Sequence, residues 1–290
     1  MATALVETAH AKINLTLRVL GRRADGYHDL ESLVVFADLA DTLTFEPGGD
    51  TALEVTGPYA AASGQPADNL VLKAQRALAA CVPSLKGGRF ILDKHLPVAA
   101  GIGGGSADAA AALRLLARAN DISIDDARLM VAALRTGADV PVCLSSRACV
   151  MTGVGERLSP PLHLPPLHAV LVNPGVALAT RDVFAAYRGD AQMATLAPQA
   201  VPRERGVLID YLEAHGNDLT DAAIVCAPVV ADVLRALSAL PGVLLARMSG
   251  SGSTCFALFA DEAEATAAAR RLTEAHKDWW VAPAVLGGRS

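Results

Sequence analysis

Four glycines stand close together near the middle of the chain, at positions 101, 103, 104 and 105. Because glycine has no Cβ, a negatively charged group can come close to the backbone N–H donors of such a loop. The Ala- and Leu-rich run from Ala107 to Ala119 has high helix propensity, so a helix N-terminus follows the loop directly. This combination indicates a phosphate-binding site. A plain glycine turn before a buried helix is the alternative.

Two common phosphate-binding motifs do not fit this stretch. A P-loop ends in Gly-Lys-Ser or Gly-Lys-Thr, whereas Gly104, Gly105 and Ser106 include no lysine. The dinucleotide-binding fingerprint needs a third glycine where Ser106 stands, and Pro97 interrupts the direct junction between strand and loop. The sequence therefore points to another kind of nucleotide loop.

Two other segments carry residues suited to phosphoryl transfer. Residues 11–20 alternate between apolar and polar, which places Lys12 and Asn14 on the polar face of a half-buried strand. Asp139 stands in the turn-like segment 136–141. A carboxylate can accept the proton of an alcohol, and a lysine can stabilise the negative charge that develops. Taken alone, Asp139 also fits a capping or turn residue and Lys12 a solvated strand lysine.

The glycine loop resembles the second motif of the GHMP kinase superfamily, Pro-x-x-x-Gly-Leu-Gly, in the form Pro97-Val-Ala-Ala-Gly101-Ile-Gly103. Ala11-Lys-Ile-Asn-Leu15 resembles the first motif of that superfamily, and Met248-Ser-Gly-Ser-Gly-Ser253 resembles the third. Three motifs in this order are far more specific than one, and the similarity covers essentially the whole chain. It implies a two-domain α+β fold, with a ribosomal-S5-like ATP-binding domain at 1–155 and a ferredoxin-like domain at 156–290. The active site is then expected in the cleft between the domains.

The resemblance also implies a role for each motif residue. Asp139 is expected to be the general base, and Lys12 to stabilise the developing charge. The residues expected to bind ATP are Pro97, Val98, Ala99, Ala100, Gly101, Ile102, Gly103, Gly104, Gly105 and Ser106. The residues expected to bind the second substrate are Asn14, Tyr27, His28, Thr180, Phe184, Gly250 and Ser251. ATP is expected to arrive with Mg²⁺. No metal ligand is assigned, because Gly104 and Gly105 stand where several related kinases have a serine pair.

The segment Gly21-Arg-Arg-Ala-Asp-Gly-Tyr-His28, together with residues 136–141, narrows the resemblance within the family. These segments resemble those of kinases within the family that phosphorylate a tertiary 2-hydroxyl group. The alcohol that carries this hydroxyl is joined to cytidine through a diphosphate. Tyr27 offers a stacking face and His28 a ring nitrogen for the base, and Phe184 is expected to supply a second face. A hairpin closed at 21–26 would place Tyr27 opposite Val19 or Leu20.

Three other functions remain open. The chain could be a related kinase that acts on homoserine, mevalonate or a sugar. It could also be a non-catalytic protein of the same architecture, either an RNA-binding domain or a nucleotide sensor. The acidic net charge disfavours RNA binding, and the pairing of Lys12 with Asp139 disfavours a sensor.

Composition excludes several further classes. A net charge of −5 and an aromatic content of 4% provide neither a basic surface nor many stacking side chains for nucleic acid. The five cysteines include no Cys-x-x-Cys pair and the seven histidines no i, i+4 pair, so neither disulfides nor a zinc site are indicated. Because no leader peptide or long apolar span is recognisable, we expect a cytoplasmic protein whose partners are small molecules, without nucleic acid or membrane.

Hydrophobic periodicity and turn residues predict the other elements. Strands are expected at 11–20, 28–36, 42–46, 52–56, 89–93, 168–173, 243–248, 254–259 and 279–285. Helices are expected at 69–81, 107–119, 125–135, 181–188, 205–215, 222–240 and 261–276. Four prolines between 153 and 166 mark the candidate domain boundary.

Overall fold

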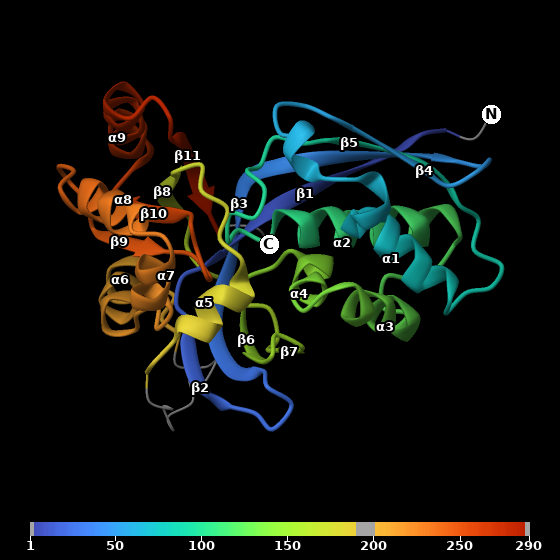
Figure 1. Cartoon of the computed structure of the whole chain (residues 1–290), viewed down its shortest axis with the longest axis horizontal. Coiled ribbons are helices and arrows are strands. Elements are labelled where there is room, and N and C mark those ends of the chain that lie inside the picture. Colours follow the sequence, from blue (N-terminus) through green and yellow to red (C-terminus); the bar gives the residue numbers. More distant parts are fainter. Residues whose placement is uncertain (1–2, 190–200, 288–290) are drawn as a thin grey trace. The chain divides into compact units, whose positions relative to one another are not determined.

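The structure is a computed structural model that describes residues 3–189 and 201–287 (Figure 1). The chain forms two compact units that alternate along the sequence. The first unit consists of residues 1–11, 39–98 and 103–146, and the second of residues 12–38, 99–102 and 147–290. Two long strands, β1 (Leu5–Asn14) and β3 (His28–Pro47), therefore contribute residues to both units.

The first unit combines a small sheet with a group of helices. Strand β5 (Gly88–Asp93) pairs antiparallel with the C-terminal half of β3 and parallel with β4 (Ala52–Thr56). Two 3₁₀ turns (Ala61–Ser63 and Pro66–Asp68) lead into the helices, which are α1 (Leu70–Ala79), α2 (Gly104–Ala119), α3 (Ala127–Thr136) and α4 (Val140–Ser145). Helix α2 packs against α1, α3 and α4, and most of its residues are buried. Its many alanines let the neighbouring helices approach closely, which holds the helix that follows the glycine loop firmly in place.

The second unit is built on an antiparallel sheet in the order β11-β8-β10-β9. These strands are β8 (Leu167–Asn173), β9 (Leu245–Met248), β10 (Cys255–Phe259) and β11 (Trp280–Leu286). Three short strands, β2 (Arg18–Arg22), β6 (Cys149–Gly153) and β7 (Arg157–Leu158), extend the N-terminal half of β3. The helices are α5 (Thr180–Ala186), α6 (Arg205–Ala214), α7 (Thr220–Cys226), α8 (Val229–Ser238) and α9 (Glu262–Ala275). Helix α9 packs on β8 and β11, and α8 packs on β9 and β10.

The predicted α+β class is confirmed, but several predicted boundaries were wrong. The strands expected at 28–36 and 42–46 form one strand of 20 residues. Asp41, which stands between the two predicted strands, is fully buried and accepts hydrogen bonds from His95 N and Leu96 N, so the strand continues through it. The helix expected at 222–240 is two helices, because Pro228 caps α8 and has no N–H to continue a helix.

Three shorter elements also differ from the prediction. Strand β1 begins at Leu5 and ends at Asn14, and the chain then continues into β2 at Arg18. Helix α4 and strands β6 and β7 lie in segments for which no element was predicted. Helix α2 begins at Gly104, before Ser106, because Gly103 adopts a left-handed conformation that caps it.

Candidate active site

The glycine loop (97–106) includes positive φ angles, which glycine adopts far more easily than any other residue. Gly101 and Gly103 have φ angles of +74° and +63°, and Ala99 has a φ of +52°, which is rare for a residue with a side chain. Helix α2 begins immediately afterwards at Gly104. Its first N–H groups have no partner within the helix and carry the positive end of the helix dipole. The end of the loop therefore has the chemistry of a phosphate-binding site.

The segment Ala99–Ile102 of this loop lies against residues 249–254, which we call the glycine turn, and both belong to the second unit. The Ser249 hydroxyl donates to the Gly101 carbonyl oxygen at 3.2 Å. A Cβ on Gly101 would lie 2.3 Å from the carbonyl oxygen of Gly252, a distance that no carbon atom tolerates. Close packing of the two backbones thus requires glycine at position 101.

The first motif meets both of these segments through its backbone. The Lys12 N–H donates to the Ile102 carbonyl oxygen at 2.9 Å. The Asn14 N–H donates to the Ser249 hydroxyl at 3.1 Å. Parts of all three sequence motifs are therefore neighbours within the second unit, although they are far apart along the chain.

The side chains of Lys12 and Asn14 are almost completely buried, with 3% and 1% of their surface exposed. Burial raises the pKa of the neighbouring Cys149 thiol to about 11, and the positive charge of Lys12 opposes that rise. A buried cation attracts an anion more strongly than a solvated one does, because less water screens it. The Asn14 amide donates to the Ser32 hydroxyl at 2.7 Å, but its Oδ1 accepts no hydrogen bond from the described residues. A hydroxyl group of a ligand could satisfy that oxygen.

Asp139 belongs to the first unit and directly precedes α4. It occupies the N-cap position of this helix, yet its side chain makes no capping hydrogen bond. The carboxylate is half-buried. A purely capping role, which the sequence also allowed, is therefore not what this side chain does.

An aromatic cluster forms around His28 in the second unit. The His28 ring stacks on Phe184 with a centroid distance of 5.0 Å and an angle of 20° between the ring planes. Tyr187, which no sequence motif marks, lies edge-on to His28, with 6.3 Å between the ring centroids. Burial, and to a smaller extent the charge of Arg22, lowers the pKa of His28. The imidazole is therefore neutral near pH 7 and can both donate and accept a hydrogen bond.

Tyr27 lies at the tip of the hairpin, and its side chain is 66% exposed. The predicted register was wrong, because His28 pairs with Arg22 and the Tyr27 carbonyl accepts from Arg23 N. Strands β2 and β3 remain paired beyond Gly21, where the turn was predicted to begin. A register shift between Val19 and Gly21 brings Gly21 opposite Asp29 and Arg22 opposite His28. A stacking face at Tyr27 is accessible to a ligand in this position.

The remaining predicted substrate residues lie at the glycine turn. The Thr180 hydroxyl is 3.0 Å from the Ser251 hydroxyl, so the start of α5 touches the turn. Gly250 has a φ of +58°, and a Cβ on it would lie 3.1 Å from the Asn14 Oδ1 atom. Thr180, Ser251, Gly250 and Asn14 are thus close together. The same unit also contains His28 and Phe184.

A buried ion network in the first unit was not found from the sequence. The Lys94 ammonium is 2.5 Å from Asp41 Oδ2 and 2.6 Å from Asp108 Oδ2, and the three side chains are at most 4% exposed. A Cβ on Gly104 would lie 3.3 Å from Lys94 Nζ, so the network packs directly under the start of α2. Burial raises the pKa of Asp108 to about 7, although Lys94 opposes the rise. Asp41, Lys94 and Asp108 are far apart along the chain, and their spacing matches no motif that would predict the network.

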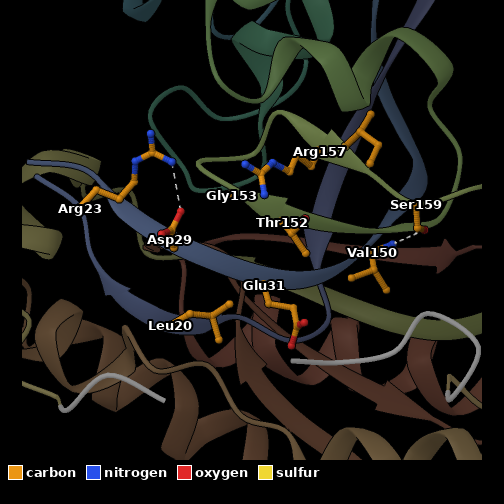
Figure 2. A pocket seen from close by; sticks show the side chains of 10 residues that line it. Leu20, Arg23, Asp29, Glu31, Val150, Thr152, Gly153, Arg157 and Ser159 are labelled. Atoms are coloured by element: carbon orange, nitrogen blue, oxygen red, sulfur yellow. Dashed lines mark hydrogen bonds and ion pairs between the residues drawn. The ribbon is translucent and has the colours of Figure 1, made fainter. Parts of the chain in front are cut away.

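Figure 2 shows a pocket of about 590 Å³ in the second unit, lined among others by Arg23, Asp29, Glu31 and Arg157. Asp29 and Glu31 follow His28 by one and three residues along β3. Because successive side chains of a strand point to opposite faces, both lie on the face opposite to that of His28. The pocket therefore lies on the other face of β3 from the His28 cluster. The Arg23 guanidinium and the Asp29 carboxylate form an ion pair of 3.2 Å at its edge.

Comparison with known proteins identifies the class that this fold and these motifs define. The family model for the GHMP kinase N-terminal domain matches residues 69–147, and the model for the GHMP kinase C-terminal domain matches residues 206–278. These two matches together cover more than half of the chain. The chain belongs to the GHMP kinase family.

Relatives and solved structures place the chain more narrowly within the family. It is 59% identical over 288 residues to the 4-diphosphocytidyl-2-C-methyl-D-erythritol kinase of Rhodopseudomonas palustris (strain BisB5), covering 96% of this chain and 98% of the relative. It is 58% identical to the kinase of the same name from Bradyrhizobium diazoefficiens, covering 96% of both chains. A crystal structure of 4-(cytidine 5'-diphospho)-2C-methyl-D-erythritol kinase matches with 35% identity and a TM-score of 0.77, over 98% of this chain and 100% of the other.

A more distant structure shares the fold alone. The homoserine kinase of Cytophaga hutchinsonii matches with a TM-score of 0.71 and 17% identity, over 99% of this chain and 97% of the other.

In residues 3–189 and 201–287 no helix has the length and apolar character needed to cross a bilayer. The same residues contain no cluster of three or more His, Cys, Asp or Glu side chains that could hold a metal ion.

Proposed function

We propose that this chain transfers the γ-phosphoryl group of ATP to the tertiary 2-hydroxyl of 4-diphosphocytidyl-2-C-methyl-D-erythritol. The products are the 2-phosphate and ADP, and the reaction is a step of non-mevalonate isoprenoid biosynthesis. The observation that carries this proposal is the 59% identity to a kinase of that name over nearly the whole length of both chains. The cytoplasm, where ATP is abundant, is the proposed location.

Asp139 and Lys12 are the proposed catalytic residues. A tertiary hydroxyl is a weak nucleophile at neutral pH, so a carboxylate that accepts its proton accelerates the attack on the γ-phosphorus. Asp139 is assigned this role from the resemblance of residues 136–141 to the family motif, and its carboxylate makes no capping hydrogen bond to α4. Lys12 suits stabilisation of the negative charge that develops on the transferred group, because its ammonium is buried and only weakly screened by water.

The glycine loop is the proposed ATP-binding segment. Its left-handed glycines and the start of α2 supply backbone N–H groups for the phosphates. ATP would enter as its magnesium complex, in which phosphate oxygens and several water molecules bind the ion. The two family models match inside the proposed domains 1–155 and 156–290. In the structure, residues 12–38 and 99–102 cluster with the unit that contains residues 147–290, so the compact units do not follow a single division of the chain.

The His28 cluster is the proposed binding site for the cytidine end of the substrate. His28 offers polar ring atoms to the edge of the base, while Phe184 and the exposed Tyr27 offer stacking faces. Asn14, Thr180, Gly250 and Ser251 are proposed to bind the alcohol and diphosphate portions. Their hydroxyl, amide and backbone groups suit such polar ligands.

The test is ADP formation with a panel of alcohols that includes the cytidine diphosphate substrate, homoserine and mevalonate. The proposal expects kcat/KM for the cytidine compound to exceed that for the other alcohols by ~10³ or more, because a site built for polar groups rejects ligands that lack them. Comparable rates with homoserine or mevalonate would instead assign the chain to another activity of the GHMP kinases.

A further inference from the structure

Asn217 lies in the short connection between α6 and α7, and its side chain forms hydrogen bonds with the backbone of the glycine turn and of the residue before it. Its amide Nδ2 donates to the carbonyl oxygens of Met248 and Gly250, both at 2.8 Å. Its Oδ1 accepts from Leu219 N at 3.0 Å, and the residue is only 9% exposed. The amide group therefore holds the backbone at two points, the last residue of β9 and Gly250 of the glycine turn.

Arg247 fixes the neighbouring strand in a similar way. Its guanidinium donates to the carbonyl oxygen of Leu15 at 2.8 Å, and to those of His215 and Leu212 at 2.7 Å each. Leu15 follows Asn14 of the first motif directly. Burial lowers the pKa of Arg247 to about 10, so the side chain stays charged at neutral pH and keeps all its donors. The first motif and the connection before Asn217 are thereby tied to strand β9, from which the glycine turn begins.

The glycine turn has two internal backbone hydrogen bonds, from Ser249 N to the Thr254 carbonyl oxygen and from Gly252 N to the Ser249 carbonyl oxygen, but neither involves the peptide group between Gly250 and Ser251. Gly250 and Gly252 have φ angles of +58° and +84°, and glycine has access to more backbone conformations than any other residue. A peptide unit is planar, so holding the Gly250 carbonyl oxygen toward Asn217 turns the Ser251 N–H to the opposite side. Within the described residues, that N–H makes no hydrogen bond.

We propose that Asn217 and Arg247 are positioning residues. They hold the glycine turn so that the Ser251 N–H points toward the diphosphate group of the substrate. The proposal rests on the proposed function, because it assumes that the turn contacts substrate. A phosphate oxygen is the matching acceptor, since backbone N–H groups in glycine-rich turns bind anions. Neither residue touches the substrate itself. Each acts through the backbone that it holds.

Asn120 provides a matched control for Asn217. Its amide Nδ2 also donates to two carbonyl oxygens, those of Lys86 and Leu116, and its Oδ1 accepts from Lys86 N. It caps the C-terminal end of α2 in the first unit. Replacing either asparagine by alanine removes three side-chain hydrogen bonds, two donated to carbonyl oxygens and one accepted from a backbone N–H, but only Asn217 contacts the glycine turn. Loss of stability and loss of positioning can therefore be separated.

The experiment measures steady-state kinetics with the cytidine diphosphate alcohol, together with thermal unfolding, for wild type, Asn217→Ala and Asn120→Ala. At a temperature at which all three are folded, Asn217→Ala should lower kcat/KM by about 10- to 100-fold, because small displacements of positioned groups have effects of this size. Asn120→Ala should stay within about 2-fold of wild type, whatever its melting temperature.

Equal kcat/KM for folded Asn217→Ala and wild type, or equal losses in both variants, would overturn the proposal. Should Asn217→Ala not fold, Arg247→Lys gives the second measurement, since it keeps the charge but loses the fork that reaches three carbonyls. It should lower kcat/KM about 10-fold, and wild-type kinetics in that variant would overturn the proposal equally. If wild type itself phosphorylates none of the alcohols, the proposed function is refuted. That result differs from failure of the positioning proposal, in which wild type is active and the variants are equally active.

Discussion

Replacement of Asp108 by asparagine should change how the stability of the protein depends on pH. Asp108 shares the ammonium of Lys94 with Asp41 inside the first unit, and its Oδ1 has no hydrogen-bond partner among the described residues. Burial raises the pKa of Asp108 from an ordinary 3.8 to about 7 in the folded protein. The folded protein therefore binds a proton at this group more tightly than the unfolded chain does.

The sign and size of the effect follow from this difference. Where the folded state holds more protons, the free energy of unfolding falls as pH rises. The stabilising contribution of Asp108 is fully present below pH 3.8 and disappears as pH rises through about 7. Each pKa unit corresponds to about 1.4 kcal/mol, so wild type should lose about 2 to 3 kcal/mol relative to Asp108→Asn between pH 5 and pH 8.

The assay is urea denaturation followed by circular dichroism at pH 5, 6, 7 and 8, with the free energies of the variant subtracted from those of wild type. Titrating groups outside the network of Lys94, Asp41 and Asp108 cancel in this difference. Asp126→Asn is the control, because the Arg128 side chain lowers the pKa of Asp126 to about 2 and the group does not titrate in this range. Its difference from wild type should be constant. A constant difference for Asp108→Asn as well would refute the reasoning about the buried network.

Two further predictions concern the proposed site. Asp139→Asn and Lys12→Met should keep the circular dichroism spectrum of wild type and lower kcat by ~10² or more, because each removes a functional group but keeps approximate shape. Near-normal kcat in either folded variant would remove that residue from the mechanism. Wild type should reject the uridine analogue of its substrate, whose base has an acceptor in place of the N4 donor, whereas His28→Ala should discriminate less. Equal kcat/KM values for both nucleotides in wild type would contradict the role of His28.

The sequence predicted the elements whose patterns are local. The alternation around Lys12 and the Ala-rich run after the glycine loop both fall in regular elements of the structure. The prediction of a half-buried strand was wrong, because residues 9–14 of β1 are buried on both faces. The continuity of β3 could not be predicted, because the burial of Asp41 depends on Lys94, 53 residues away. The break before α8 did have a signal, since Pro228 stands inside the segment interpreted as one helix.

The same distinction applies to the candidate site. Its motif residues were recognisable because their types and spacing are specific, and His28 and Phe184 do stack on each other. Asn217 and Arg247 were missed because they act on backbone carbonyl oxygens, which every residue has and no sequence pattern marks. Tyr187 was missed because a single aromatic residue one helical turn after Phe184 is equally consistent with ordinary packing.

The most direct measurement of the central claim is the ³¹P spectrum of the product formed from ATP and the cytidine diphosphate alcohol. A phosphate on the tertiary 2-hydroxyl has no hydrogen on the carbon that carries the ester oxygen. The proposed reaction therefore predicts one new monoester resonance without three-bond coupling to hydrogen, formed in equal amount to ADP. A triplet or doublet would show phosphorylation of a primary or secondary hydroxyl, and the absence of any new monoester would contradict the proposed function altogether.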